Sequence, residues 1–176
     1  MRTYKVKIEG VAPLRMNKFT EDAKNTLQGG RKKKSKEDSI KEAYERTYTN
    51  AKGEYIVPAK AIKACILNGA KKVPLGKGKA KTDSKAVIFI EGDMILQHSE
   101  PTIIEEVVRI PPKTGALAVK YFVVFPKWHG EFTVLVTDDR FPEQVLSESI
   151  KEAGMYAGLL DGRPDFGRFV MTEFSE

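Results

Sequence analysis

Residues 55–68, YIVPAKAIKACILN, are the stretch that decides the fold of this chain. The first three residues form a short apolar run of strand type, and Pro58 suits the first turn of a helix. The following residues place their apolar side chains on one helical face, with Lys60 and Lys63 on the opposite face. The stretch therefore predicts a brief strand that runs directly into an amphipathic helix, with Gly69 as its stop.

Apolar periodicity on either side of this stretch predicts the other elements. Alternation of apolar and charged residues predicts a first strand over 4–11, and helical spacing predicts a short helix over 37–47 and another that starts near Asp139. Further strands are predicted at 85–91, 102–110, 118–125, 131–137 and 168–174. This order predicts an α+β fold of ferredoxin-like (RRM-like) topology, an antiparallel sheet with helices on one face. We expect residues 1–176 to form one domain, with a basic, thumb-like insertion at about 19–52.

Composition excludes several classes of protein. The longest apolar runs are five residues, whereas a helix that crosses a bilayer needs about twenty, so we expect no membrane contact. The N-terminus lacks the apolar stretch of a signal peptide, which predicts a cytoplasmic location. One cysteine cannot form an internal disulfide, and two histidines nearly exclude a conventional zinc site. We expect no metal ion and no cofactor.

The positive charge is unevenly distributed. Residues 24–85 hold 17 Lys and Arg against 6 Asp and Glu, whereas the rest of the chain holds 13 against 18, within a net charge of +6. A basic segment on a mildly acidic body indicates a polyanionic partner, and nucleic acid is the commonest one. The alternative is a solvated lysine-rich loop that aids solubility.

Three groups of lysine and arginine residues are the candidate phosphate contacts in this segment. They are a cluster after a Gly-Gly pair (Arg31, Lys32, Lys33, Lys34, Lys36), a series in a Gly/Pro-punctuated stretch (Lys71, Lys72, Lys77, Lys79, Lys81), and the pair Lys60 and Lys63 at the start of the predicted helix. Lysines of this kind bind the phosphates of a nucleic acid backbone and do not distinguish base sequences. The helix pair has an equal alternative as the solvated side of an amphipathic helix.

A turn near the C-terminus carries two arginines, each next to a glycine: Gly162-Arg163 and Gly167-Arg168. Guanidinium groups bind phosphate through two donors, and glycine lets the backbone approach the same group. We therefore expect this turn to anchor a nucleic acid strand and to share one groove with the lysines. In the alternative, it is a strand-entry turn whose arginines pair with neighbouring aspartates.

Aromatic residues offer a further mode of binding. Tyr44, Tyr48 and Tyr55 lie within the basic region, where rings interleaved with lysines stack bases in sequence-tolerant single-strand binders. Packing of the insertion against the body is an equally good interpretation. For Trp128, which lies in a predicted hairpin turn beside Pro126 and Gly130, packing at the rim is the default, and the alternative is a stacking platform or a subunit contact.

Two segments resemble a known family. Tyr55–Ala64 resembles the segment that opens the first helix in the RAMP superfamily, and Gly158–Phe169 resembles the glycine-rich loop of the same superfamily. A basic insertion after the first strand is similar in placement to the thumb of these proteins, and small phage and mobile-element proteins look similar. The resemblance implies a ferredoxin-like fold and RNA binding in CRISPR effector complexes, where the backbone-type subunit coats guide RNA.

These observations together predict non-catalytic binding of RNA or single-stranded DNA, with coating of a guide RNA by repeated subunits as one form. The predicted partners are the nucleic acid, copies of the chain and other effector subunits. One alternative is a RAMP-type ribonuclease that uses a loop histidine without metal or a thumb aspartate with a metal, for which His98, His129 and Asp38 are the candidates. Another is a mobile-element protein that blocks host defence by imitating or occupying an effector subunit.

Overall fold

A central antiparallel sheet organises the computed structural model, which describes residues 1–21, 34–76, 78–110 and 112–176. In spatial order its main strands are β12 (Phe169–Ser175), β1 (Arg2–Gly10), β11 (Trp128–Val136) and β6 (Ile88–Glu91), with the short β8 (Gln97–His98) also paired to β11. The first and last strands of the chain are therefore neighbours, and the two middle strands lie on the other side of β1.

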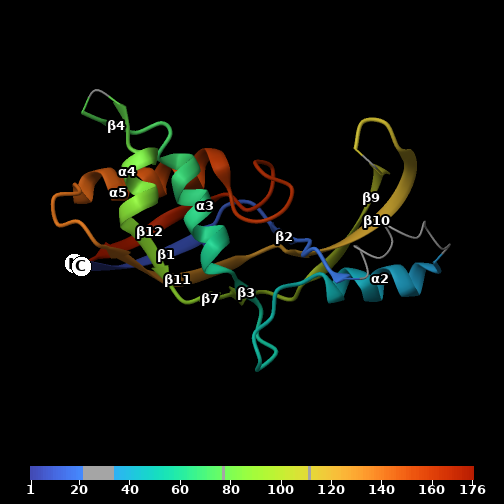
Figure 1. Cartoon of the computed structure of the whole chain (residues 1–176). Coiled ribbons are helices and arrows are strands. Elements are labelled where there is room, and N and C mark those ends of the chain that lie inside the picture. Colours follow the sequence, from blue (N-terminus) through green and yellow to red (C-terminus); the bar gives the residue numbers. More distant parts are fainter. Residues whose placement is uncertain (22–33, 77, 111) are drawn as a thin grey trace.

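Apart from the helix of the projecting arm described below, the helices lie together on one face of this sheet (Figure 1). Helix α3 (Ala59–Gly69) lies between β1 and β6 in the chain, and α5 (Glu143–Glu152), continued by the π-helical turn η1 (Ala153–Ala157), lies between β11 and β12. This β-α-β-β-α-β order confirms the predicted α+β, ferredoxin-like fold. Among the described helices, none is long and apolar enough to cross a membrane.

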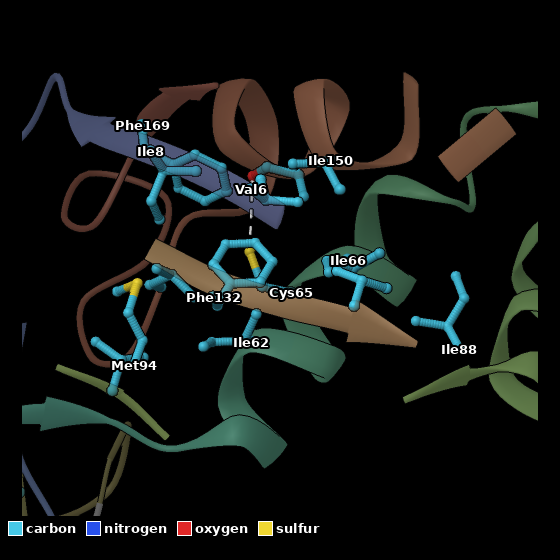
Figure 2. Close-up of a cluster of buried hydrophobic side chains, with 14 of the residues drawn as sticks. Val6, Ile8, Ile62, Cys65, Ile66, Ile88, Met94, Phe132, Ile150 and Phe169 are labelled. Carbon is cyan, nitrogen blue, oxygen red and sulfur yellow. Dashed lines mark hydrogen bonds between the residues drawn. The ribbon is translucent and has the colours of Figure 1, made fainter. Parts of the chain in front are cut away.

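The hydrophobic core fills the space between the helices and the sheet (Figure 2). Val6 and Ile8 of β1 meet Ile62 and Ile66 of α3, and Ile150 of α5 completes this part of the cluster. Alternation along β1 directs its odd-numbered residues to the opposite face. The apolar stripe predicted for α3 from its spacing is thus the stripe that is buried.

Gly69 does more than end α3. A Cβ atom at this position would lie 2.1 Å from the Ser149 carbonyl oxygen and 2.5 Å from the Ala153 nitrogen. The absence of a side chain therefore lets the end of α3 approach the α5–η1 backbone closely. The predicted helix stop is correct in position, but its main structural consequence is this helix contact.

A second sheet with one helix projects from the body, and we call it the arm (Figure 1). Its strand order is β2–β10–β9, and its helix packs against β10. These elements are β2 (Leu14–Met16), β10 (Ala116–Phe125), β9 (Thr102–Ile110) and α2 (Lys36–Glu45). Of the arm's described elements, α2 comes from the predicted insertion, whereas the long β9–β10 hairpin comes from a distant part of the chain.

Two local expectations differ from the structure. The predicted strand at 85–91 begins only at Ile88, because the preceding residues form α4 (Lys81–Val87), which buries Ser84 completely. The expected loop through the second lysine group contains a small hairpin, β4 (Pro74–Leu75) with β5 (Gly78–Lys79). A further short pair joins the segment before α3 to the one after β6, as β3 (Ile56–Val57) with β7 (Met94–Ile95).

Candidate nucleic-acid interface

The glycine-rich loop, residues 158–168, connects η1 to β12. Three of its glycines have left-handed backbone conformations, at Gly158 (φ +75°), Gly162 (+74°) and Gly167 (+74°). The loop closes on itself, since the Leu159 amide donates to the Gly167 carbonyl at 2.9 Å, and a Cβ on Gly167 would lie 2.1 Å from the Leu159 oxygen. Glycine is therefore required at this position by both conformation and close approach.

Backbone hydrogen bonds also fasten this loop to the connection between β1 and β2. The Gly167 amide donates to the Pro13 carbonyl at 2.8 Å. The Arg168 carbonyl accepts from the amides of Val11 and Ala12, at 2.9 and 3.3 Å. The loop is thus held in one shape mainly by main-chain contacts.

The side chains of Arg163 and Arg168 are exposed. Arg168 donates from Nε to the Pro164 carbonyl at 2.9 Å. Across the described parts of the chain, neither arginine pairs with an acidic side chain, as the strand-entry alternative required, whereas Arg46 and Arg140 each hold a carboxylate. The loop therefore presents two guanidinium groups whose charge is not neutralised by the protein.

Arg15 of β2 is the residue that sequence reasoning missed. Its Nε lies 2.7 Å from Asp161 Oδ2 and its terminal nitrogen lies 2.7 Å from Glu106 Oε2. The guanidinium carbon lies 4.2 Å from the ring centre of Phe122 and 4.7 Å from that of Phe166. With only 12% of its side chain exposed, Arg15 joins the glycine-rich loop to the arm. The signal was its position as a lone charge between two apolar residues in LRM.

The lysines around the β4–β5 hairpin lie at the other end of the helical layer from the glycine-rich loop (Figure 1). Lys71 and Lys72 follow α3, and the Lys72 ammonium lies 3.2 Å from the ring centre of Tyr156. Lys81 opens α4 and is exposed. Lys79 belongs to β5, and Lys77 lies outside the described residues. This group is not brought to the two arginines.

The first turn of α3 holds Lys60 and Lys63 as predicted. Lys60 is exposed, and the Lys63 ammonium lies 4.4 Å from the ring centre of Phe89 on the edge strand β6. Asp93 accepts the amide hydrogen of Ala59 at 2.8 Å, so a carboxylate already occupies part of the positive end of this helix. Because of this contact, the N-terminus of α3 is less suited to bind a phosphate.

The remaining lysines stand at the start of α2 in the arm. The Lys34 ammonium lies 2.8 Å from a Glu42 oxygen, and the Lys36 ammonium lies 5.9 Å from the Tyr121 ring centre. Burial alone would raise the pKa of Glu42, but hydrogen bonds from Lys34 and Arg46 outweigh it and hold the pKa below its usual range. The rest of this predicted cluster, Arg31, Lys32 and Lys33, lies outside the described residues. The described cations therefore occupy several surfaces rather than one groove.

The three catalytic candidates have separate surroundings. The His98 ring contacts the rings of Tyr55 and Phe125 edge-on, and its Nδ1 lies 2.8 Å from the Ser99 carbonyl. His129 is exposed on β11, and Asp38 accepts a hydrogen bond from the Ser35 hydroxyl that caps α2. Within the described ranges, no group of three or more His, Cys, Asp or Glu side chains could hold a metal ion.

Aromatic side chains near the arm are mostly packed. Trp128 is buried and donates from its indole nitrogen to the Ala12 carbonyl at 2.9 Å, so the packing interpretation is correct. Tyr55 contacts Phe125, whereas Tyr44 remains 41% exposed. Of the tyrosines proposed for stacking, Tyr44 is thus the one most open to a base.

The sheet face away from the helices is not a basic surface. It carries a hollow of about 740 Å³ lined in part by Lys7, Glu9, His129 and Glu131. The Lys7 ammonium is held by Glu173 at 2.6 Å, with Glu131 at 4.0 Å. Alternation also places Lys5 on this face. Because Lys7 is neutralised and the carboxylates of Glu9 and Glu131 lie close to it, the face does not suit a polyanion.

Two solved structures have a fold similar to that of this chain. A chain from the cryo-EM structure of the Type III-B Cmr-beta bound to cognate target RNA matches with a TM-score of 0.60 and 11% identity, over 98% of this chain and 59% of that one. Cmr6 from Pyrococcus furiosus matches with a TM-score of 0.50 and 14% identity, over 98% of both chains. This chain thus spans 59% of the length of the first structure. Both show a fold like that of this chain.

No protein-family model and no curated protein matches the chain.

Proposed function

We propose that this chain is a non-catalytic RNA-binding subunit of a CRISPR-type effector complex. One observation carries the proposal: Arg163 and Arg168 present guanidinium groups without acidic partners on a loop held rigid by its backbone. Guanidinium groups fixed in this way bind phosphate strongly, because little side-chain and loop entropy remains to be lost on binding.

The fold and its relatives support RNA over single-stranded DNA. The first of the similar structures is described as bound to target RNA, and the position of the glycine-rich loop beside the arm offers a strand two neighbouring surfaces. In the proposal Arg163 and Arg168 anchor the phosphates, Tyr44 of α2 offers a ring for stacking, and the exposed Lys60 of α3 adds positive charge. Coating of a guide by repeated subunits stays a prediction.

We expect the double variant Arg163→Ala/Arg168→Ala to bind single-stranded RNA at least about tenfold more weakly, because two charge-assisted contacts are lost. The slope of log affinity against log salt should also fall by about 1.4, since each phosphate contact on a single strand contributes about 0.7. Fluorescence anisotropy with a labelled RNA, repeated at several salt concentrations, measures both quantities.

Arg140→Ala is the matched control, because Arg140 is an exposed arginine that, among the residues the structure describes, pairs with its neighbour Asp138 alone. It should leave affinity and slope almost unchanged. If the double variant binds RNA as the unmodified protein does, the loop is not the anchor and the proposal is wrong.

Purification without nuclease separates the competing functions. The proposal predicts that intact RNA co-purifies with the chain and is lost from the Arg163→Ala/Arg168→Ala variant. Cleaved RNA that becomes intact when His98, His129 or Asp38 is replaced would support the ribonuclease alternative. Protein partners that remain bound after nuclease treatment, with no RNA, would support the defence-blocking alternative.

A further inference from the structure

Strand β9 forms the outer edge of the arm. It is nine residues long and, among the described residues, its ladder is with β10 alone. A long edge strand presents backbone amide and carbonyl groups that can pair with another strand. The neighbouring side chains are apolar and unusually open: Val107 and Leu117 are each 64% exposed, and Val119 is 51% exposed.

The open side chains lie on one face of the hairpin. In the β9–β10 register Val107 stands opposite Val119, and Arg109 stands opposite Leu117. Because side chains alternate along a strand, Glu105 shares this face with Val107 and Arg109. Along β9, this face therefore carries an acid (Glu105), an apolar residue (Val107) and a base (Arg109) at successive alternate positions.

This pattern complements itself when the strand is reversed. If two β9 strands pair antiparallel about Val107, Glu105 of each copy stands opposite Arg109 of the other, and Val107 stands opposite its own equivalent. A register centred one residue earlier would place Glu106 opposite itself, and one centred a residue later would place Arg109 opposite Val107. Opposite charges stabilise a directly facing pair and like charges destabilise it, so the central register is favoured.

The other charge near the edge is already neutralised. Glu106, which would face Val108 of the partner copy, lies 2.7 Å from a terminal nitrogen of Arg15. Pairing of the two edges therefore brings no uncompensated carboxylates into contact.

We propose that two copies of this chain associate through their β9 edges, antiparallel and with the two-fold axis at Val107. The two three-stranded arms then form one continuous sheet. Such a contact uses the same surface on both chains and closes at two copies. It differs from an open array of repeated subunits along RNA, and it involves neither Arg163 nor Arg168, so it stands or falls independently of the proposed function.

Sedimentation equilibrium of the RNA-free chain, over about 1 µM to 1 mM, tests the association as a two-state equilibrium between monomer and dimer. We expect Glu105→Arg and Arg109→Glu each to weaken the dimer about tenfold, because each change places like charges opposite one another at two symmetric positions. The combined variant Glu105→Arg/Arg109→Glu restores the opposite pairs and should return to within about threefold of the unmodified dimer. A chain that stays monomeric throughout, or a combined variant weaker than both single ones, would overturn the proposal.

Cysteine cross-linking gives a second test that does not depend on affinity. Val107→Cys should form a disulfide-linked dimer on mild oxidation, because the two introduced thiols face each other across the axis. Leu117→Cys is the matched control, equally exposed but one strand away from the edge. The native Cys65 does not interfere, because it is buried and burial raises the pKa of its thiol to about 12. Absence of the Val107 cross-link, or equal cross-linking at Leu117, would show that the edges do not meet.

Discussion

Replacing Gly167 by alanine is expected to destabilise the protein by about 3 kcal/mol, which corresponds to a fall of about 6–12 °C in the melting temperature of a chain of this size. Two costs add at this residue. The backbone has a φ of +74°, and the new Cβ would lie 2.1 Å from the Leu159 carbonyl oxygen. The contact is with backbone, so no side-chain rotation can relieve it. Thermal unfolding followed by circular dichroism measures the effect.

Gly53→Ala separates the two costs. Gly53 has a similar φ of +79°, but nothing lies within 4 Å of a Cβ placed there. This variant should lose only about 1 kcal/mol, the cost of the left-handed conformation. Equal losses at both glycines would mean that the close approach at Gly167 contributes nothing.

The outcome also bears on how Gly167 is interpreted. The sequence suggested that Gly167 lets a phosphate approach the backbone. In the structure, the space beside Gly167 is occupied by the backbone of Leu159, which belongs to the same loop. A loss of RNA binding in Gly167→Ala would therefore follow from a disturbed loop. The arginine variants are the cleaner test of binding. They keep the main-chain contacts that hold the loop, although Arg168→Ala removes the hydrogen bond from Arg168 Nε to the Pro164 carbonyl.

Arg15→Ala is expected to lower the free energy of unfolding by about 3 kcal/mol, because breaking a buried ion pair by removing one partner leaves the other charge uncompensated. Asp161 and Glu106 would both lose their cation, and the rings of Phe122 and Phe166 would lose the group between them. Urea denaturation measures the change. Trypsin should also cut the arm faster in the variant, since Arg15 links β2, the hairpin and the loop.

Two further variants provide comparisons for the loss of stability expected in Arg15→Ala. Arg15→Lys keeps the charge but loses the planar group that stacks and binds two carboxylates, so an intermediate loss is expected. Arg140→Ala removes an ion pair whose arginine side chain is 90% exposed, and it should cost less than about 1 kcal/mol. A loss for Arg15→Ala no larger than that for Arg140→Ala would contradict the linking role.

The Arg15 contacts also keep one nearby acid away from the loop arginines. Asp161 lies just before Arg163 in the loop, and Arg15 holds it at 2.7 Å. In Arg15→Ala the carboxylate becomes available to neighbouring cations. RNA affinity should therefore fall in this variant through two routes, a looser loop and a competing anion.

Much of the fold could be predicted from local patterns. Residues 102–110 were predicted as a strand with the observed bounds, and the predicted helix at 37–47 differs from the observed one by only one or two residues at each end. Periodicity identifies such elements because the side chains on one face of a strand or helix follow a fixed spacing. It failed at 85–87, where a helix continues into an apolar strand without a break in hydrophobicity.

The sequence by itself determined the order of the main strands and helices, the buried face of α3, and the presence of a glycine-rich turn with two arginines. Those properties depend on neighbouring residues, whose spacing sets which side chains share a surface. Only the tertiary structure decided that Arg15 holds Asp161 and Glu106, that the lysines lie on several surfaces, and that β9 is an open edge. These depend on contacts between residues far apart in the chain, where charge and shape meet only after the arm and the body have folded.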